Sequence, residues 1–269
     1  MRTFKLLVAY DGTDYVGWQR QPSGDSIQGL IETALAPIEG GPVTVVGAGR
    51  TDAGVHATGQ VASVCLTSGV DAADLRRALN ARLPPDVRVL AADVVADTFH
   101  ARFHARAKTY EYRIVNAVSH SPFAHRYTWH IPWRLEIERM ADAALLIEGV
   151  HDFAAFQSAG SSVTSTRRRV FSSALIRAGN ECVAQSPETV VDGELLVYRV
   201  TGDGFLRHMV RAIVGALVEI GSRRAETTRL SDLLDRTAPR SAAPSAPAHG
   251  LCLRSVAYTE PFPEVVTHR

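Results

Sequence analysis

The stretch VTVVGAGRTDAGVHATGQVASV, residues 43–64, decides how this chain folds. A β-branched run leads into Gly47, Ala48 and Gly49, and Gly54 follows shortly after. Two interpretations fit this pattern. The glycines could form a loop that cradles a pyrophosphate, or they could form a tight connection between two strands that presents Arg50 and Asp52 for chemistry.

A dinucleotide-binding fingerprint requires a strand, a glycine turn and then a helix, because the N-terminus of the helix holds the pyrophosphate. Here residues 58–66, TGQVASVCL, have the composition of a strand, and the next helical pattern starts only at Asp71. The glycine spacing also differs from the fingerprint, since Ala53 separates Asp52 from Gly54. The stretch therefore predicts a strand–loop–strand unit.

Outward from this unit, the first half of the chain predicts the order β-α-β-β-α-β. Ser26 and Asp71 are expected to cap the two helices, and the proline pair at 84–85 to end the second. The second half predicts the same order again, with strands at 108–116, 170–178, 194–202 and 251–258 and helices at 135–149 and 205–221. This predicts an α+β protein of two ferredoxin-like or RRM-like domains, residues 1–105 and 106–269.

Composition narrows the class of protein. The chain has 269 residues, 46% of them hydrophobic, and a net charge of +1. Its three cysteines are far apart, which argues against a disulfide framework and against a cysteine-rich zinc site. Because no signal peptide or membrane-spanning stretch is recognisable, we expect a cytoplasmic protein. Local basic clusters at 99–113 and 166–170 could follow a phosphate backbone, although a solvated face is the simpler explanation for each.

The residues of several motifs resemble the tRNA pseudouridine synthase A family. The most specific is GRTDAGVHATGQV at 49–61. The others follow in the order of the family: YDGTDYVGWQRQP at 10–22, LNARLPPDVRV at 79–89, DTFHARFHARAKTYEYRI at 97–114, FLRHMVRAIVGALVEIG at 205–221 and AHGLCL at 248–253. The resemblance covers nearly the whole chain and is weakest across residues 158–197.

This resemblance implies the isomerisation of uridine to pseudouridine in the anticodon stem-loop of tRNA, at tRNA positions 38, 39 and 40. It implies a homodimer that uses no cofactor and no metal and does not act at a membrane. It also implies that the sheets of the two domains join into one extended, mainly antiparallel sheet, with helices on one side and a central catalytic cleft.

The resemblance also assigns the site residues. Asp52 matches the catalytic aspartate of the family, and Arg211 the arginine that would pair with it from the second domain. Tyr110 would pack on the target uracil and help remove its C5 proton. Arg50 would enter the gap left by the flipped uridine. We expect Arg207, on the same helix as Arg211, either to contact phosphate or to be a solvated residue.

Two rival functions remain open on the residues alone. A non-catalytic protein of two RRM-like domains would share the fold, but VASVCL at 61–66 and LVYRV at 196–200 offer few of the expected aromatic residues. A glycoside or nucleoside hydrolase usually needs two carboxylates, and no second acid accompanies Asp52 in its motif. His100 and His104 have a spacing that could suit a metal, but they alternate with apolar residues in a segment expected to be extended or irregular.

Overall fold

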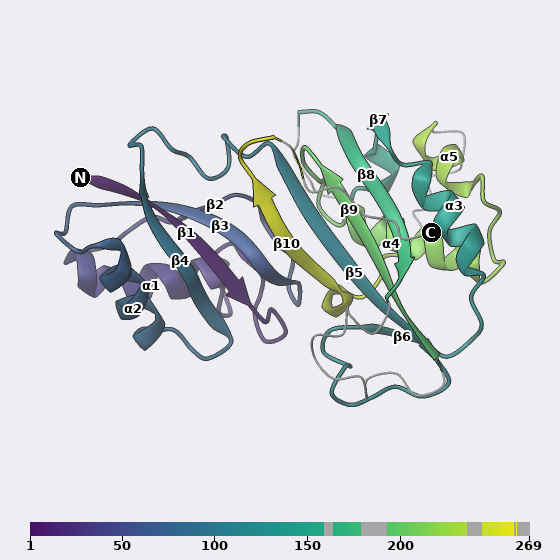
Figure 1. Cartoon of the computed structure of the whole chain (residues 1–269), viewed down its shortest axis with the longest axis horizontal. Coiled ribbons are helices and arrows are strands. Elements are labelled where there is room, and N and C mark those ends of the chain that lie inside the picture. Colours follow the sequence, from purple (N-terminus) through teal and green to yellow (C-terminus); the bar gives the residue numbers. More distant parts are fainter. Residues whose placement is uncertain (159–163, 179–192, 236–243, 261, 263–269) are drawn as a thin grey trace. The chain divides into compact units, whose positions relative to one another are not determined.

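The chain divides into two compact units in a computed structural model, which describes residues 1–158, 164–178, 193–235, 244–260 and 262. Unit 1 consists of Met1–Lys108 and Cys252–Glu260, and unit 2 consists of Thr109–Leu251 and Pro261–Arg269. The C-terminal strand thus returns to the unit that the N-terminal half forms. Helices and strands of both units are labelled in Figure 1.

Unit 1 has the element order that the sequence predicts. Its elements are β1 (Arg2–Tyr10), α1 (Ile27–Glu39), β2 (Val46–Gly47), β3 (His56–Leu66), α2 (Ala72–Arg82) and β4 (Val87–Val95), joined by most of β10 (Leu251–Ala257). The strand order is β4-β1-β3-β10, and β2 pairs with β3. The pairings of β1 with β3 and β4 are antiparallel, whereas β10 runs parallel to β3.

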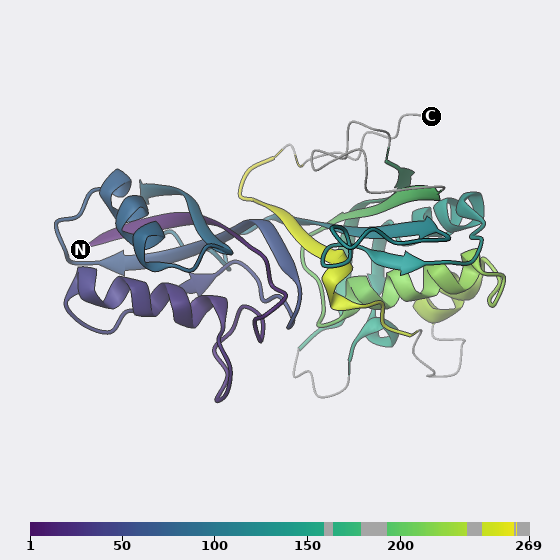
Figure 2. The same ribbon diagram turned by 90° about the horizontal axis from the view of Figure 1, so that it is seen from below.

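Local signals set the starts of both helices in unit 1. The Ser26 hydroxyl accepts a hydrogen bond from the Gly29 amide at 3.2 Å, and the Asp71 carboxylate accepts one from the Asp74 amide at 2.7 Å. Alternate side chains of β1 and the apolar side chains of α1 are buried in one core. This core includes Phe4, Leu6, Val8, Ile27, Ile31 and Leu35. Figure 2 shows α1 running along one face of this sheet.

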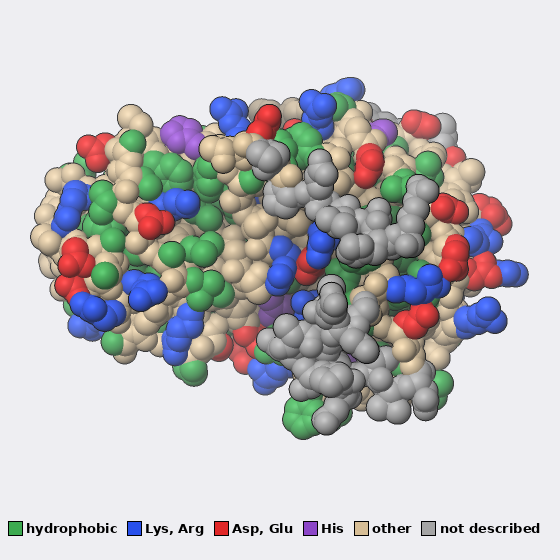
Figure 3. Space-filling view, viewed as in Figure 1, with side chains coloured by type: hydrophobic (Ala, Val, Ile, Leu, Met, Phe, Trp, Pro, Cys, Tyr) green, Lys and Arg blue, Asp and Glu red, His purple; other side chains and the backbone are tan. Residues whose placement is uncertain are grey.

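The opposite face of unit 1 keeps apolar groups at the surface. Figure 3 shows hydrophobic side chains gathered over the strands of this unit, with charged groups among them. The edge strand β4 contributes Leu90 and Val94, which are 46% and 52% exposed.

Unit 2 contains most of β5 (Ala107–Ala117), together with β6 (Trp129–Ile131), α3 (Ile137–Leu145), β7 (Gly149–Asp152), β8 (Arg167–Arg177), β9 (Gly193–Gly202), α4 (Met209–Gly221) and α5 (Arg229–Leu234). Short 3-10 turns occur at Ala154–Phe156 and Ala248–Gly250. The strand order is β5-β9-β8-β7, and β6 runs parallel to β5. Figure 2 shows α4 running along one face of these strands.

The α+β class with mainly antiparallel strands is confirmed, and two helix boundaries in unit 2 differ from the expectation. α3 ends at Leu145, and Gly149, expected to close it, instead opens the unexpected strand β7. α4 starts at Met209 and not at Phe205. Residues 179–192, within the stretch where the family resemblance is weakest, lie outside the described residues.

Candidate active site

Asp52 lies on the connection between β2 and β3, and it is half-buried. A turn follows it, in which the Val55 amide donates to the Asp52 carbonyl at 3.1 Å and Gly54 has a φ of 77°. β3 begins directly afterwards at His56, and residues 47–71, all of them described, contain no helix. The strand–loop–strand prediction is therefore confirmed, and the dinucleotide-binding interpretation is excluded.

Buried side chains fix the backbone just before Asp52. The Tyr10 and Thr51 hydroxyl oxygens lie 2.9 Å apart, and the Gln60 side-chain amide donates to the Gly49 carbonyl at 2.9 Å. Burial raises the pKa of Tyr10, and its hydrogen bonds with Thr51 and Gln60 oppose that shift only in part. Tyr10 therefore stays a neutral phenol near neutral pH, and residues 49–51 are held from two strands.

The segment between β1 and α1 lies against the other side of the Asp52 connection. The Trp18 amide donates to the Thr51 carbonyl at 3.1 Å, and the Gly54 amide donates to the Tyr15 carbonyl at 3.4 Å. Gly17 has a φ of 102°, and a Cβ on it would lie 2.5 Å from the Thr51 carbonyl oxygen. A side chain at this position would thus push the two segments apart.

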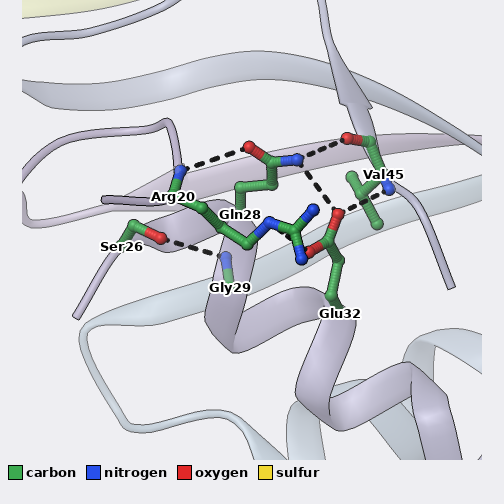
Figure 4. Close-up of polar contacts among 6 residues, drawn as sticks. All are labelled: Arg20, Ser26, Gln28, Gly29, Glu32 and Val45. Atoms are coloured by element: carbon green, nitrogen blue, oxygen red, sulfur yellow. Dashed lines mark hydrogen bonds and ion pairs between the residues drawn. The ribbon is translucent and has the colours of Figure 1, made fainter. Parts of the chain in front are cut away.

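Helix α1 also holds the chain that leads into this site (Figure 4). The Gln28 side-chain amide donates to the Val45 carbonyl at 3.1 Å, and the Glu32 carboxylate accepts from the Val45 amide at 2.9 Å. Glu32 is only 7% exposed, and it also forms an ion pair with Arg20 at 3.2 Å. Because α1 uses both backbone groups of Val45, this residue does not pair in a sheet, and β2 begins only at Val46.

Arg50 is exposed, and the side chain of Lys108 lies over the neighbouring residue Gly49. A Cβ on Gly49 would lie 3.2 Å from Cε of Lys108, so the lysine side chain runs over the backbone at this point. The surface around Arg50 thus gains a second cation, which is suited to a phosphate-bearing ligand.

In unit 2, Tyr110 and Tyr112 are both buried on β5, but their surroundings differ. The ring of Tyr110 meets the ring of Phe205 edge to face, with centroids 5.2 Å apart. The Tyr112 hydroxyl donates to the Pro247 carbonyl at 2.8 Å. Burial raises the pKa of Tyr112, and the charge of Arg211 partly opposes this shift. Tyr112 is thus a neutral structural donor.

Arg211 is held by the segment that precedes β10. Its Nε donates to the Ala246 carbonyl at 2.7 Å, and the Ala246 amide donates to the Arg211 carbonyl at 3.0 Å. One turn further along α4, a Cβ on Gly215 would lie 1.6 Å from the Pro244 carbonyl oxygen. We call residues 244–247 the strap. It crosses α4 at close range and fixes the direction of the Arg211 side chain.

The expectation that Arg207 lies on the same helix as Arg211 is wrong. α4 begins at Met209, and His208 before it has a left-handed φ of 65°, which no helical residue adopts. Arg207 is exposed in the turn ahead of the helix, and its carbonyl accepts from the Ser158 amide at 3.4 Å. Its direction is therefore set by this turn and not by the helical spacing to Arg211.

The site residues that the sequence predicts are divided between the units. Arg50 and Asp52 belong to unit 1, whereas Tyr110, Arg207 and Arg211 belong to unit 2. The pairing of Asp52 with Arg211 stays a prediction.

The Nδ1 atoms of His100 and His104 accept hydrogen bonds from nearby backbone amides. Nδ1 of His100 accepts from the Arg102 and Phe103 amides, each at 3.2 Å, and Nδ1 of His104 accepts from the His100 amide at 3.3 Å. Across the described residues, no group of three or more His, Cys, Asp or Glu side chains is placed to hold a metal ion.

Within the part of the chain that the structure describes, no helix combines the length and apolar character needed to cross a membrane.

The model of the tRNA pseudouridine synthase family matches residues 6–104 and 143–259 of this chain. The chain belongs to that family. It is similar to the tRNA pseudouridine synthase A of Syntrophotalea carbinolica, with 42% identity over 96% of this chain and 97% of the relative. The enzymes of that name from Moorella thermoacetica and Solibacter usitatus are 41% and 43% identical, and each match covers 96% of this chain and 100% of the relative.

Membership of the tRNA pseudouridine synthase family favours an isomerase over the non-catalytic RNA-binding protein. Tyr10, Trp18 and Gln60 lie within the motifs that resemble the family, yet only the structure shows that they hold the Asp52 connection. The sequence could have pointed to these residues, since Tyr10 and Trp18 lie in the motif at 10–22 and Gln60 in the motif at 49–61. The strap had no such signal, because its residues belong to a stretch rich in Pro, Ala and Ser.

Proposed function

We propose that this member of the tRNA pseudouridine synthase family isomerises uridine to pseudouridine in the anticodon stem-loop of tRNA, at tRNA positions 38, 39 and 40. The observation that carries the proposal is Asp52 itself: a half-buried carboxylate within the motif at 49–61, on a connection whose backbone is held on both sides. Such fixation suits a group that must meet one atom of a substrate within a fraction of an ångström.

The reaction needs no second substrate. The bond between C1′ and N1 breaks, the uracil turns while bound, and C1′ bonds to C5. The proton on C5 leaves, and N1 takes one up, so atoms and charge balance. Asp52 would serve as the nucleophile at C1′ or C6, or would assist formation of a glycal intermediate. No redox step occurs, so the chemistry calls for no cofactor.

Unit 2 would supply the groups around the base. Tyr110 would pack on the uracil and assist removal of the C5 proton, and its edge-to-face contact with Phe205 supports a fixed ring orientation. Arg211 would pair with Asp52 and keep it charged and oriented. The hydrogen bond from its Nε to the Ala246 carbonyl supports this role, because it fixes the direction of the guanidinium.

A uridine stacked in RNA must leave the helix before Asp52 can reach it, at a cost of about a few kcal/mol. Arg50 would enter the gap, and its exposure two residues before Asp52 supports this assignment. The planar guanidinium can stack on neighbouring bases as a lysine cannot. Arg207, also exposed, would contact a phosphate.

By resemblance to the family, we also propose that the protein acts as a homodimer in the cytoplasm. Light scattering coupled to size-exclusion chromatography at micromolar concentration tests the dimer, and a monomer would contradict it.

Carbodiimide mapping of anticodon-arm uridines tests the function directly. Transfer RNA that contains no modified bases is treated with the wild-type protein or with Asp52→Asn, and pseudouridine is read as stops in reverse transcription. We expect stops that depend on the protein at tRNA positions 38, 39 and 40 with the wild type and none with the variant, while both bind tRNA. Full activity of Asp52→Asn would remove the aspartate from the mechanism, and release of free uracil would indicate a hydrolase.

A further inference from the structure

His56 is a buried polar residue that the proposed mechanism does not use. It opens β3, four residues after Asp52, and is only 5% exposed. The Gly12 amide donates to its Nδ1 at 3.0 Å. The contact joins the segment after β1 to the segment that carries Asp52.

The direction of this hydrogen bond fixes which nitrogen of the neutral His56 ring carries the proton. An Nδ1 that accepts a proton from Gly12 carries a lone pair, so a neutral ring holds its own proton on Nε2. Oδ1 of Asp11 lies 3.1 Å from the same Nδ1, which would be an ion pair only if Nδ1 were protonated. That oxygen instead accepts from the amide of Thr13 at 3.0 Å and from its hydroxyl at 2.5 Å. Nδ1 therefore acts here as an acceptor for the backbone.

Gly12 is placed where it can transmit this contact to Asp52. A Cβ on Gly12 would lie 2.1 Å from the Val55 carbonyl oxygen, so the two backbones touch. The Val55 amide in turn donates to the Asp52 carbonyl. The Asp11 amide donates to the Asp86 carbonyl at 2.9 Å, which ties the same segment to the start of β4. One end of the Asp52 turn is thereby connected to the body of unit 1 through His56 and Gly12.

We propose that His56 is a positioning residue: its Nδ1 holds the Gly12 amide and so fixes the turn that presents Asp52 to the substrate. This inference rests on the proposed function. A histidine that merely fills the core would need only volume at this position, whereas a positioning histidine needs an acceptor atom where Nδ1 lies.

Three substitutions separate these two roles. His56→Asn places Oδ1 at the same number of bonds from the backbone as Nδ1, and so keeps an acceptor for Gly12. His56→Gln carries its acceptor one bond further out, and His56→Leu has volume but no acceptor. Each variant is assayed for tritium release from tRNA labelled at uridine C5, in single turnover, together with tRNA affinity and melting temperature.

We expect His56→Asn to react within about fivefold of the wild type, and His56→Gln and His56→Leu to react more slowly by on the order of 10- to 100-fold, with little change in tRNA affinity. If His56→Leu does not fold, the comparison of the Asn and Gln variants decides. Equal rates in those two, or a wild-type rate in His56→Leu, would overturn the inference while the wild type stays active. A wild-type protein that releases no tritium would overturn the proposed function and the inference with it.

Discussion

The hydroxyl oxygens of Tyr10 and Thr51 lie 2.9 Å apart in the core of unit 1, where Tyr10 is 4% and Thr51 6% exposed. This contact joins the end of β1 to the residue that precedes Asp52. Tyr10, which lies in the motif at 10–22, thus stabilises the connection that carries Asp52 and has no proposed catalytic role.

Tyr10→Phe and Thr51→Val should each destabilise the protein by about 1–3 kcal/mol, because each leaves the other hydroxyl buried without this partner. The double variant should lose less than the sum of the two, with a coupling of about 1 kcal/mol. Urea unfolding of the four proteins measures this. Strictly additive losses would show that the two hydroxyls do not depend on each other.

Arg211→Ala should lower the single-turnover rate far more than it weakens tRNA binding, because the guanidinium is proposed to orient Asp52 and not to hold RNA. A loss of about 100-fold or more in rate, with affinity within about threefold, is the expected pattern. Arg207→Ala is the control, and it should weaken affinity with little effect on the rate. The reverse pattern in the two variants would exchange their roles.

Gly215→Ala should displace the strap, because the new methyl group would lie 1.6 Å from the Pro244 carbonyl oxygen. Overpacking of this kind costs about 1–3 kcal/mol, and here it should also lower the reaction rate, since Arg211 would lose its bond to Ala246. Gly221→Ala on the same helix is the matched control. Its methyl group would meet the flexible Met140 side chain, so it should affect stability alone. Equal rates in both variants would contradict a role for the strap.

Glu32→Leu should destabilise unit 1 by about 1–3 kcal/mol, because the Val45 amide loses its acceptor. Arg20→Gln, which removes only the exposed partner of Glu32, should cost less than about 1 kcal/mol, since the Arg20 side chain is 62% exposed. Chemical denaturation compares the two. A larger loss in Arg20→Gln would mean that the ion pair, and not the capture of the backbone, is what Glu32 contributes.

His120 should make the protein less stable in mild acid. Burial lowers the pKa of His120 below its ordinary value of 6.5, and the neighbouring His130, His125 and His249 lower it further. The unfolded chain therefore takes up a proton near that value while the folded chain resists, so the stabilisation is present above it and is lost as the pH falls. Between about pH 7.5 and 5.5, wild type should lose more stability than His120→Gln. An equal loss in both proteins would exclude His120 as the cause.

Several features followed from the sequence because the forces that set them are local. Ser26 and Asp71 each cap a helix with an atom a few residues away, so position in the chain was enough to find them. The composition of residues 58–66 predicted β3, and the motif at 49–61 singled out Asp52. The pattern also gave the α+β class, since the apolar periods of helices and strands differ.

Other features depended on contacts between residues far apart in sequence. β2 has only two residues because Gln28 and Glu32 of α1, 17 and 13 residues before Val45, bind both backbone groups of Val45. The last strand pairs in parallel with β3 of unit 1, which no local pattern indicates.

The sequence by itself therefore determined the fold class, the family and the aspartate that we propose as the catalytic group. Only the tertiary structure decided what holds that aspartate and Arg211 in place: Tyr10 against Thr51, Gly12 against His56, and the strap across α4. The physical reason is that a hydrogen bond between buried groups depends on their separation in space, and sequence spacing carries no record of that separation once the chain has turned back on itself.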